Sequence, residues 1–285
     1  PVAAVVIGAL IWFVNIPGMN ASTGLILAMT PAAEGPGGNI RLFTDLAAQE
    51  SFASQEIREQ LISFAAMVVR SSQTTDQEKQ QAAALAVSEM QKQVARYPLD
   101  ARERLQLAYA YRVIGNGTEA LKEIREAARL SPGKQEILIQ EGALAWDLGQ
   151  VEEAHKAFTK AYALSPQFES LAVYAAVGNI AIGNTEAADA ILLDVYGSVV
   201  VDNDILAVAY YRTHNWPRLI TLWKLRADKP GAPVDVWFSL AAAYYAAGEK
   251  SSALKTINKA ISIYPEAASA AASAIAQIEG RAVGQ

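Results

Sequence analysis

At residues 135–166 the chain reads QEILIQEGALAWDLGQVEEAHKAFTKAYALSP. On either side of Gly149, apolar residues recur three to four positions apart, which is the spacing of one face of an α-helix. Glycine permits the left-handed backbone that ends a helix, and Pro166 ends the second segment. The stretch therefore predicts a hairpin of two helices.

The same pattern recurs along the chain at a nearly constant period. The turn residues Gly115, Gly149, Gly183 and Asn215 follow one another at 34, 34 and 32 residues, and Gly248 comes 33 residues later. Small residues and unit-ending prolines keep the same step: Ala120, Ala154, Ala188, Ala253, Pro98, Pro132, Pro166 and Pro265. The pattern resembles tetratricopeptide repeats (TPRs). The resemblance implies an all-α, right-handed TPR-type α-solenoid, which presents a concave binding surface and no buried catalytic pocket.

Six hairpins are predicted, at residues 55–98, 101–132, 135–166, 169–200, 201–232 and 234–265. The fourth of the five regular repeats is expected to be the weakest, because His214, Asn215 and Pro217 replace the glycine turn. The expected organisation is a truncated transmembrane helix at 1–16, a linker with a short apolar helix at 17–39, a helical linker with a degenerate repeat at 40–98, the TPR array at 99–265, and a capping helix and tail at 266–285.

Composition excludes several classes of protein. The chain has 285 residues, of which 52% are hydrophobic and 19% charged, and this balance argues against disorder. A net charge of −5 without a basic stripe argues against a nucleic-acid partner, which needs clustered Lys and Arg. The absence of cysteine excludes disulfides and thiolate metal sites.

The N-terminal segment has the composition of a membrane helix. The run from Val2 to Val14 has no polar side chain, yet its 13 residues fall short of the ~20 that span a bilayer. We interpret it as a truncated transmembrane helix, with a signal peptide and a buried globular helix as alternatives. No Lys or Arg follows until Arg41, whereas cytoplasmic flanks are usually positive. The repeats are therefore expected on the extracytoplasmic side of the cytoplasmic membrane.

The segment before the repeats carries a second resemblance, spread over five short motifs: Ile11–Asn15, Pro17, Asn20–Ser22, Asn39–Phe43 and Gln55–Leu61. Together they resemble the C-terminal region of O-antigen ligase/polymerase-like membrane proteins. The resemblance implies a last membrane helix followed by extracytoplasmic TPRs. The glycan-transfer residues of that family belong to upstream membrane helices and their large loop, so no catalytic residue is carried over to this chain.

A search for catalytic or metal-binding residues gives no candidate. His155 and His214 have no carboxylate pair at ligand spacing, and the glycines at 35–38 and 115–117 lack the Lys-Ser/Thr of a phosphate loop. Glu56, Arg58 and Glu59 are expected on a solvated helix face. We therefore predict no catalytic residue, cofactor or metal.

The candidate binding surface is the concave face, which the first helices build with the second, fifth, ninth and twelfth positions of each repeat unit. Its prominent side chains are Arg102, Tyr109, Arg112, Trp146, Arg212, Phe238 and Tyr245. Aromatic residues and arginine anchor peptide or protein partners, and aromatic faces also suit sugar rings. The alternative is that Trp146 and Phe238 pack between hairpins. The arginines favour an acidic or carbohydrate-bearing partner.

The leading hypothesis is a non-catalytic, extracytoplasmic interaction module of a polytopic membrane protein that ligates or polymerises cell-envelope polysaccharide. The chain itself is not expected to be an enzyme, although the full-length parent would be a glycan transferase. The alternative is a soluble or singly anchored TPR scaffold unrelated to glycans.

Overall fold

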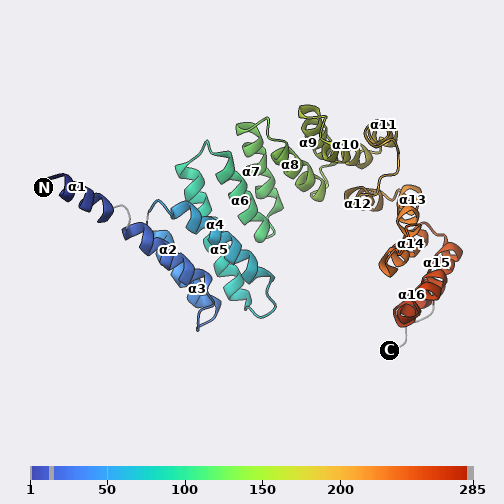
Figure 1. Ribbon diagram of the computed structural model, residues 1–285, viewed down its shortest axis with the longest axis horizontal. Coiled ribbons are helices and arrows are strands. Elements are labelled where there is room, and N and C mark those ends of the chain that lie inside the picture. Colours follow the sequence, from blue (N-terminus) through green and yellow to red (C-terminus); the bar gives the residue numbers. More distant parts are fainter. Residues whose placement is uncertain (1, 13–15, 50, 281–285) are drawn as a thin grey trace. The chain divides into compact units, whose positions relative to one another are not determined.

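The computed structural model describes residues 2–12, 16–49 and 51–280. Within these ranges the secondary structure is entirely helical, which confirms the all-α expectation (Figure 1). The chain divides into two compact units, one up to Leu144 and one from Ala145. Each unit is a succession of helices in which sequence neighbours pack together.

The first unit contains α1 (Val2–Leu10), α2 (Ile16–Met29), α3 (Pro36–Ala48), α4 (Ser54–Arg70), α5 (Asp76–Arg96), α6 (Ala101–Val113), α7 (Gly117–Leu130) and most of α8 (Gln135–Asp147). The second contains α9 (Val151–Leu164), α10 (Glu169–Ala181), α11 (Thr185–Tyr196), α12 (Asp204–Arg212), α13 (Trp216–Ala227), α14 (Val234–Ala246), α15 (Lys250–Ile263), the short 3₁₀ helix η2 (Pro265–Ala267) and α16 (Ala268–Glu279).

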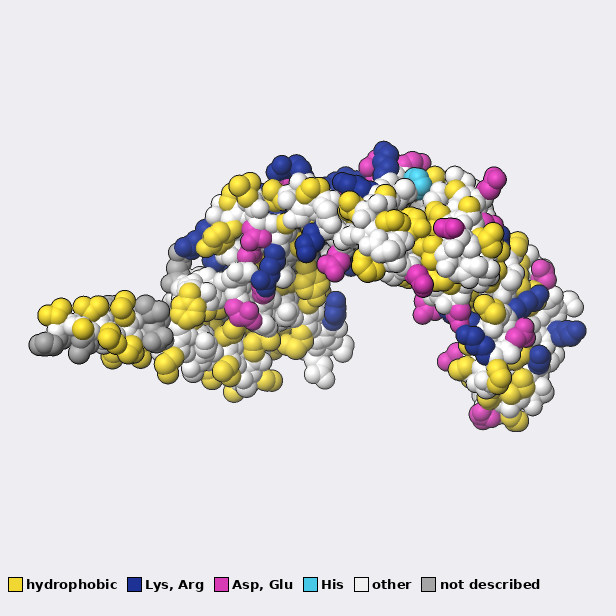
Figure 2. Space-filling view, turned by 45° about the horizontal axis from the view of Figure 1, so that its top comes forward, with side chains coloured by type: hydrophobic (Ala, Val, Ile, Leu, Met, Phe, Trp, Pro, Cys, Tyr) yellow, Lys and Arg dark blue, Asp and Glu magenta, His cyan; other side chains and the backbone are white. Residues whose placement is uncertain are grey.

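The N-terminal helices differ from the expected membrane span. Helix α1 has nine residues, about 14 Å of helix against the ~30 Å of a hydrocarbon core. Within the described ranges, no helix combines the length and hydropathy that a membrane span requires. Hydrophobic side chains nevertheless cover the surface of α1 (Figure 2). The parts of this prediction that concern Pro1 and residues 13–15 lie outside the described residues, as does the tail at 281–285.

Helix α2 is longer than predicted. The sequence predicted a linker with one short apolar helix at 17–39, but α2 runs from Ile16 to Met29. Pro17 does not interrupt it, because proline is tolerated in the first helical turn, where backbone N–H groups have no partner in any case.

The predicted linker at 17–39 also contains the start of a second helix, because α3 begins at Pro36. Its Asn39 is buried and ties α3 to the end of α2. The Asn39 side-chain amide donates hydrogen bonds to the carbonyl oxygens of Ala28 and Thr30, both at 2.7 Å, and its oxygen accepts one from the N–H of Ala32 at 3.2 Å. The side chain thus satisfies carbonyls that the end of α2 leaves free.

The core of the first unit contains a polar network that corrects a sequence expectation. Arg58 does not lie on a solvated face but is buried between α4 and α5. Its guanidinium donates to Gln93 Oε1 at 2.7 Å and to Glu89 Oε2 at 3.3 Å. Gln93 in turn donates to Glu103 Oε1 of α6 at 3.2 Å. Buried charges are tolerated when paired in this way.

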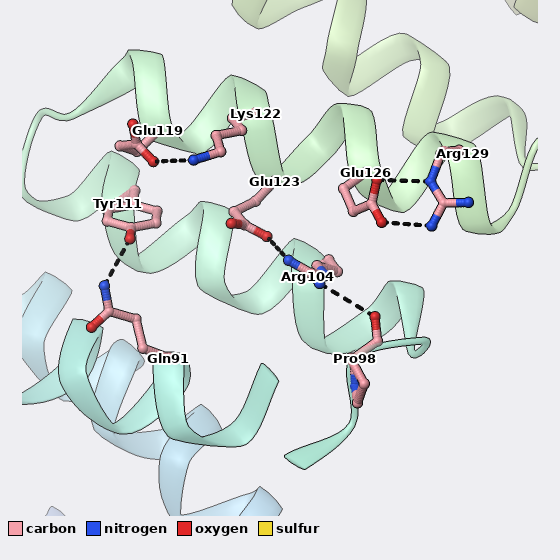
Figure 3. A network of polar contacts seen from close by, with 9 residues as sticks. All are labelled: Gln91, Pro98, Arg104, Tyr111, Glu119, Lys122, Glu123, Glu126 and Arg129. Atoms are coloured by element: carbon pink, nitrogen blue, oxygen red, sulfur yellow. Dashed lines mark hydrogen bonds and ion pairs between the residues drawn. The ribbon is translucent and has the colours of Figure 1, made fainter. Parts of the chain in front are cut away.

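Polar contacts also join α5, α6 and α7 (Figure 3). Arg104 of α6 pairs with Glu123 of α7 at 2.8 Å and donates to the Pro98 carbonyl at 3.3 Å. Gln91 of α5 donates to the Tyr111 hydroxyl of α6 at 2.9 Å. These contacts connect successive helices, whereas the nearby pair of Glu126 and Arg129 lies within α7.

The turns inside the hairpins share one geometry. Gly115, Gly149, Gly183 and Gly248 have φ values of 74° to 82°, and the residue after each donates its N–H to a carbonyl five residues back, as from Asn116 to Tyr111 at 2.9 Å. This is the Schellman arrangement, which closes a helix through a left-handed residue.

In the fourth repeat the left-handed residue is His214, with φ 55°, and not Asn215. Asn215 instead donates its N–H to the Tyr210 carbonyl at 2.8 Å, so it corresponds to Asn116. The true spacing from Gly183 is therefore 31 residues, and from His214 to Gly248 it is 34. The sequence alignment of this repeat was wrong by one residue.

Candidate functional site

The corrected register changes which side chains of α12 occupy the binding positions. In each repeat the N–H of the left-handed residue donates to the carbonyl three residues back, which belongs to Arg112, Trp146, Ile180, Tyr211 and Tyr245 in turn. Tyr211, not Arg212, therefore stands at the position of Trp146 and Tyr245. One turn earlier, Val208 takes the binding position in place of Ala209.

These two side chains belong to an apolar groove of about 290 Å³ in the second unit, between α12, α13 and α14. Val208 is 52% exposed and Tyr211 62% exposed. The full lining is Ala207, Val208, Tyr211, Leu219, Trp223, Ser239, Ala242, Ala243 and Ala246. Small residues of α14 thus form one wall, and larger side chains of α12 and α13 form the other.

The fourth repeat opens a groove because two of its packing residues differ from the pattern. Five residues after the left-handed residue, the other four repeats have the alanines at 120, 154, 188 and 253, all at most 1% exposed, whereas this repeat has Leu219. Nine residues after it, the others bury Ile124, Phe158, Leu192 and Ile257, whereas Trp223 stays partly exposed. Leu219 is still buried, at 4% exposed, and both larger side chains line the groove.

An arginine lies over the ring of Trp223. The Arg226 guanidinium lies 4.7 Å from the centre of its ring and pairs with Asp202 at 2.6 Å and with Asp204 at 2.7 Å. Lys229 also pairs with Asp202. The hydrogen bond from Lys229, opposed by burial and reinforced by Arg226, lowers the pKa of Asp202. Arg226 is therefore held over the ring by its carboxylate partners.

Two residues predicted for the binding surface meet in the second unit. The Arg212 guanidinium lies 4.1 Å from the centre of the Trp146 ring, donates to the Trp146 carbonyl at 2.9 Å and pairs with Asp147 at 2.8 Å. Trp146 is only 8% exposed. This burial agrees with the alternative that Trp146 packs between helices. The charge of Arg212 is matched by that of Asp147.

Three predicted residues lie on α6 of the first unit. Tyr109 and Arg112 are exposed, while Arg102 pairs with Glu59 of α4 at 2.8 Å. Arg102 also borders a wide cleft of about 980 Å³, which the exposed side chains of Tyr97 and Leu99 line as well. Mixed charges and an open shape give this cleft no single chemical preference.

The last two predicted residues lie on α14. Phe238 packs against the cluster formed by α14, α15 and α16, so it too fits the packing alternative. Tyr245 is exposed at the end of the helix. Neither residue lines the α12–α14 groove.

Sequence reasoning missed Val208, Tyr211 and Trp223. A signal was available, because an asparagine follows the turn glycine directly at Asn116 and Asn184. Aligning Asn215 with these residues, rather than with the glycines, would have placed Val208 and Tyr211 at the binding positions. Among the described residues, no group of three or more His, Asp and Glu side chains could hold a metal ion.

Comparison with known proteins supports the repeat assignment. The tetratricopeptide repeat family matches residues 135–168 and 234–266, which contain α8–α9 and α14–α15. The chain therefore contains a TPR region. No curated protein sequence matches it.

The chain resembles several solved structures. A tetratricopeptide repeat protein from Parabacteroides merdae ATCC 43184 superposes with a TM-score of 0.51 at 18% identity, over 72% of this chain and 79% of that one. PilF of Pseudomonas aeruginosa gives 0.43 at 15% identity over 74% and 93%, and a TPR protein of Thermus thermophilus gives 0.42 at 18% over 63% and 98%. The superposition on the Parabacteroides merdae protein shows that the two chains share a fold.

Proposed function

We propose that this chain is a non-catalytic protein-interaction module, and that the α12–α14 groove binds an apolar side chain of a partner polypeptide. The observation that carries the proposal is the exposure of Val208 and Tyr211 beside a wall of alanines. Exposed apolar side chains that line a concavity are typical of interaction sites, and aromatic residues are frequent anchors there.

The lining favours an apolar side chain over a sugar. Its polar side-chain groups are the hydroxyls of Tyr211 and Ser239 and the indole N–H of Trp223. A sugar presents many hydroxyl groups, and each one left without a hydrogen-bond partner on burial costs free energy. An aliphatic or aromatic side chain has no such requirement and gains from burial.

A peptide-display experiment tests the groove. Random peptides are selected on the immobilised chain, and the enriched peptides are then titrated against two variants. Ala242→Trp fills the groove from α14, and Ala190→Trp makes the same change at an exposed alanine of α11 that does not line it. We expect Ala242→Trp to weaken binding at least tenfold and Ala190→Trp to leave it unchanged.

Equal binding by both tryptophan variants would show that the peptides bind elsewhere, and the groove proposal would then be wrong. Circular dichroism of the two variants is the control for folding. Because both alanines are exposed, neither substitution is expected to disturb a core.

We further propose that the N-terminal segment attaches the chain to a lipid bilayer. The support is an uninterrupted apolar surface, since the side chains of Val2, Val5, Val6, Ile7, Leu10, Ile11 and Trp12 are all more than half exposed. An apolar helix of this kind gains free energy by entering the interface of a membrane.

Flotation with lipid vesicles measures this attachment. The chain is expected to float with the vesicles, Ile7→Glu to float less, and Leu193→Glu, at an exposed leucine of α11, to behave as the unchanged chain does. Equal flotation of all three proteins would contradict attachment through α1.

The parent protein is a further part of the proposal. We propose that the module belongs to an O-antigen ligase-like membrane protein of the cell envelope, with the repeats on the extracytoplasmic side of the cytoplasmic membrane. The support is the resemblance of the segments at 11–22, 39–43 and 55–61. A soluble or singly anchored scaffold is the alternative. The genomic sequence upstream of Pro1 decides between them, because a series of apolar helices there supports the ligase-like parent.

A further inference from the structure

Two carboxylates lie at one end of the α12–α14 groove. Asp204 and Asp235 stand in the first turns of α12 and α14. Four residues further along the same helices come Val208 and Ser239, which line the groove. Residues four apart share a helix face, and four residues advance the helix by about 6 Å. Because α13 reverses the chain between α12 and α14, the two carboxylates lie at the same end.

Both carboxylates are available to a partner. The Asp204 side chain is 89% exposed, and the Arg226 guanidinium occupies only its Oδ1. A carboxylate has about four acceptor sites, so the second oxygen can accept further hydrogen bonds. Asp235 is exposed and forms no ion pair with any of the described residues.

The positive charges nearby do not offset these carboxylates completely. Arg226 pairs with Asp202 and Asp204, and Lys229 pairs with Asp202, so neither cation pairs with Asp235. Helices α12 and α14 carry Asp204 and Asp235. Arg212 is the one Lys or Arg in these two helices, and it already pairs with Asp147. First-turn carboxylates also stabilise their own helices through the helix dipole, but that role leaves their outer oxygens exposed.

We infer that the groove selects a polypeptide in which a lysine or arginine lies within one or two residues of the apolar anchor side chain. The inference rests on the proposed function of the groove. The anchor enters between Val208 and Ala242, and the basic side chain reaches Asp204 or Asp235 at its end. This partner has the opposite charge from the acidic one that the sequence favoured, because the structure pairs Arg212 with Asp147.

Two fluorescent peptide libraries of one layout test the inference. Each has a central Leu, Ile, Phe or Trp among Gly, Ser and Ala, and the flanking charges are two lysines in one library and two glutamates in the other. Binding is followed by fluorescence anisotropy at low and at high salt. We expect the lysine library to bind roughly tenfold more tightly at low salt, since each exposed pair contributes about threefold, and the preference to shrink at high salt.

The variant Asp204→Asn/Asp235→Asn should lose most of this preference while it still binds the lysine library. The matched control, Glu186→Gln/Asp194→Asn, removes the same two charges from exposed positions of α11 and should keep the preference. An equal or stronger affinity for the glutamate library would overturn the inference. An equal loss of the lysine preference in both double variants would also overturn it, because net charge alone would then explain the preference. If Ala242→Trp binds both libraries as the unchanged chain does, the groove itself is not the site and the proposed function fails.

Discussion

At the scale of single residues, the backbone conformation of His214 sets the register of the fourth repeat. His214 is the one described residue other than glycine with a positive φ, and its ring lies edge-on to Trp216 with the ring centres 5.1 Å apart. Histidine tolerates the left-handed region better than most residues, yet it still costs free energy there that glycine does not. Because His214 rather than Asn215 takes the left-handed conformation, the repeat positions on α12 differ by one residue from those predicted.

Reciprocal substitutions at two turns measure that cost. No atom lies within 4 Å of a Cβ added at Gly149, so Gly149→Ala should lower the free energy of unfolding by about 1 kcal/mol through the backbone alone. His214→Gly should leave it unchanged or raise it by up to about 1 kcal/mol. Denaturant unfolding followed by tryptophan fluorescence measures both. A loss for His214→Gly as large as that for Gly149→Ala would show that the imidazole contact with Trp216 outweighs the backbone.

Glu103 predicts a pH dependence of stability. Its side chain is 1% exposed, and Oε2 has no hydrogen-bond partner among the described residues. Burial raises the pKa of Glu103 above its ordinary 4.5, against the hydrogen bond from Gln93 and with support from Asp100 and Glu59. The folded protein therefore keeps this proton to a higher pH than the unfolded chain does. The resulting stabilisation is complete below pH 4.5 and is lost as the pH rises through the folded-state pKa.

Glu103→Gln removes the titration but keeps the shape of the side chain. The variant should gain stability relative to the unchanged chain as the pH rises from 4 to 7, on the order of 1 kcal/mol, because an unpaired buried carboxylate is no longer formed. Denaturant unfolding at several pH values tests this, with Glu136→Gln at an exposed site as the control. A stability difference that does not change with pH would contradict the prediction.

At the scale of elements, the fourth repeat stands apart from the others. Its first helix, α12, has nine residues, whereas α6, α10 and α14 have thirteen each. It also packs less extensively against α13 than α6 does against α7. A shorter helix has fewer internal hydrogen bonds beyond its frayed ends, and it buries less apolar surface.

We therefore expect the amide protons of α12 to exchange with solvent faster than those of α14 in the same unit. Local opening requires less free energy where fewer buried contacts must break. Hydrogen–deuterium exchange followed by mass spectrometry compares the two helices within one experiment. Equal or slower exchange in α12 would contradict this expectation.

At the scale of the whole molecule, the chain forms two compact units, and within each unit successive helices pack together. In a repeat array each repeat contacts only its neighbours, so a weakened region unfolds before the rest. Tryptophans offer a natural probe of the second unit: Trp146, Trp216, Trp223 and Trp237 all lie in it. Trp12, in the first unit, is 65% exposed and reports little on folding.

Phe43→Ala should separate the two units in an unfolding experiment. Phe43 is fully buried in the first unit, with its ring centre 5.2 Å from that of Phe64, and its truncation should cost about 3–5 kcal/mol there. The transition seen by circular dichroism should broaden or shift to lower denaturant, while the transition seen by tryptophan fluorescence stays nearly in place. Coincident shifts of both signals would mean that the chain unfolds as one cooperative unit.

Local signals in the sequence determined the helical hairpins. Gly115, Gly149, Gly183 and Gly248 do adopt the left-handed turn conformation, and Ala120 and Ala154 are fully buried. Such positions are predictable because their requirement is set by a few neighbours in the chain: a turn needs a residue that tolerates positive φ, and a close helix contact needs a small side chain.

Only the tertiary structure decided where the exposed and buried side chains of α12 and α4 lie. His214 rather than Asn215 takes the left-handed conformation after α12, and with that register Tyr211 rather than Arg212 lines the groove. Likewise, Arg58 is buried because Glu89 and Gln93 face it from a helix more than thirty residues away in sequence. Periodicity identifies the face of a helix to within about one residue, but burial and binding depend on the partner that the face meets.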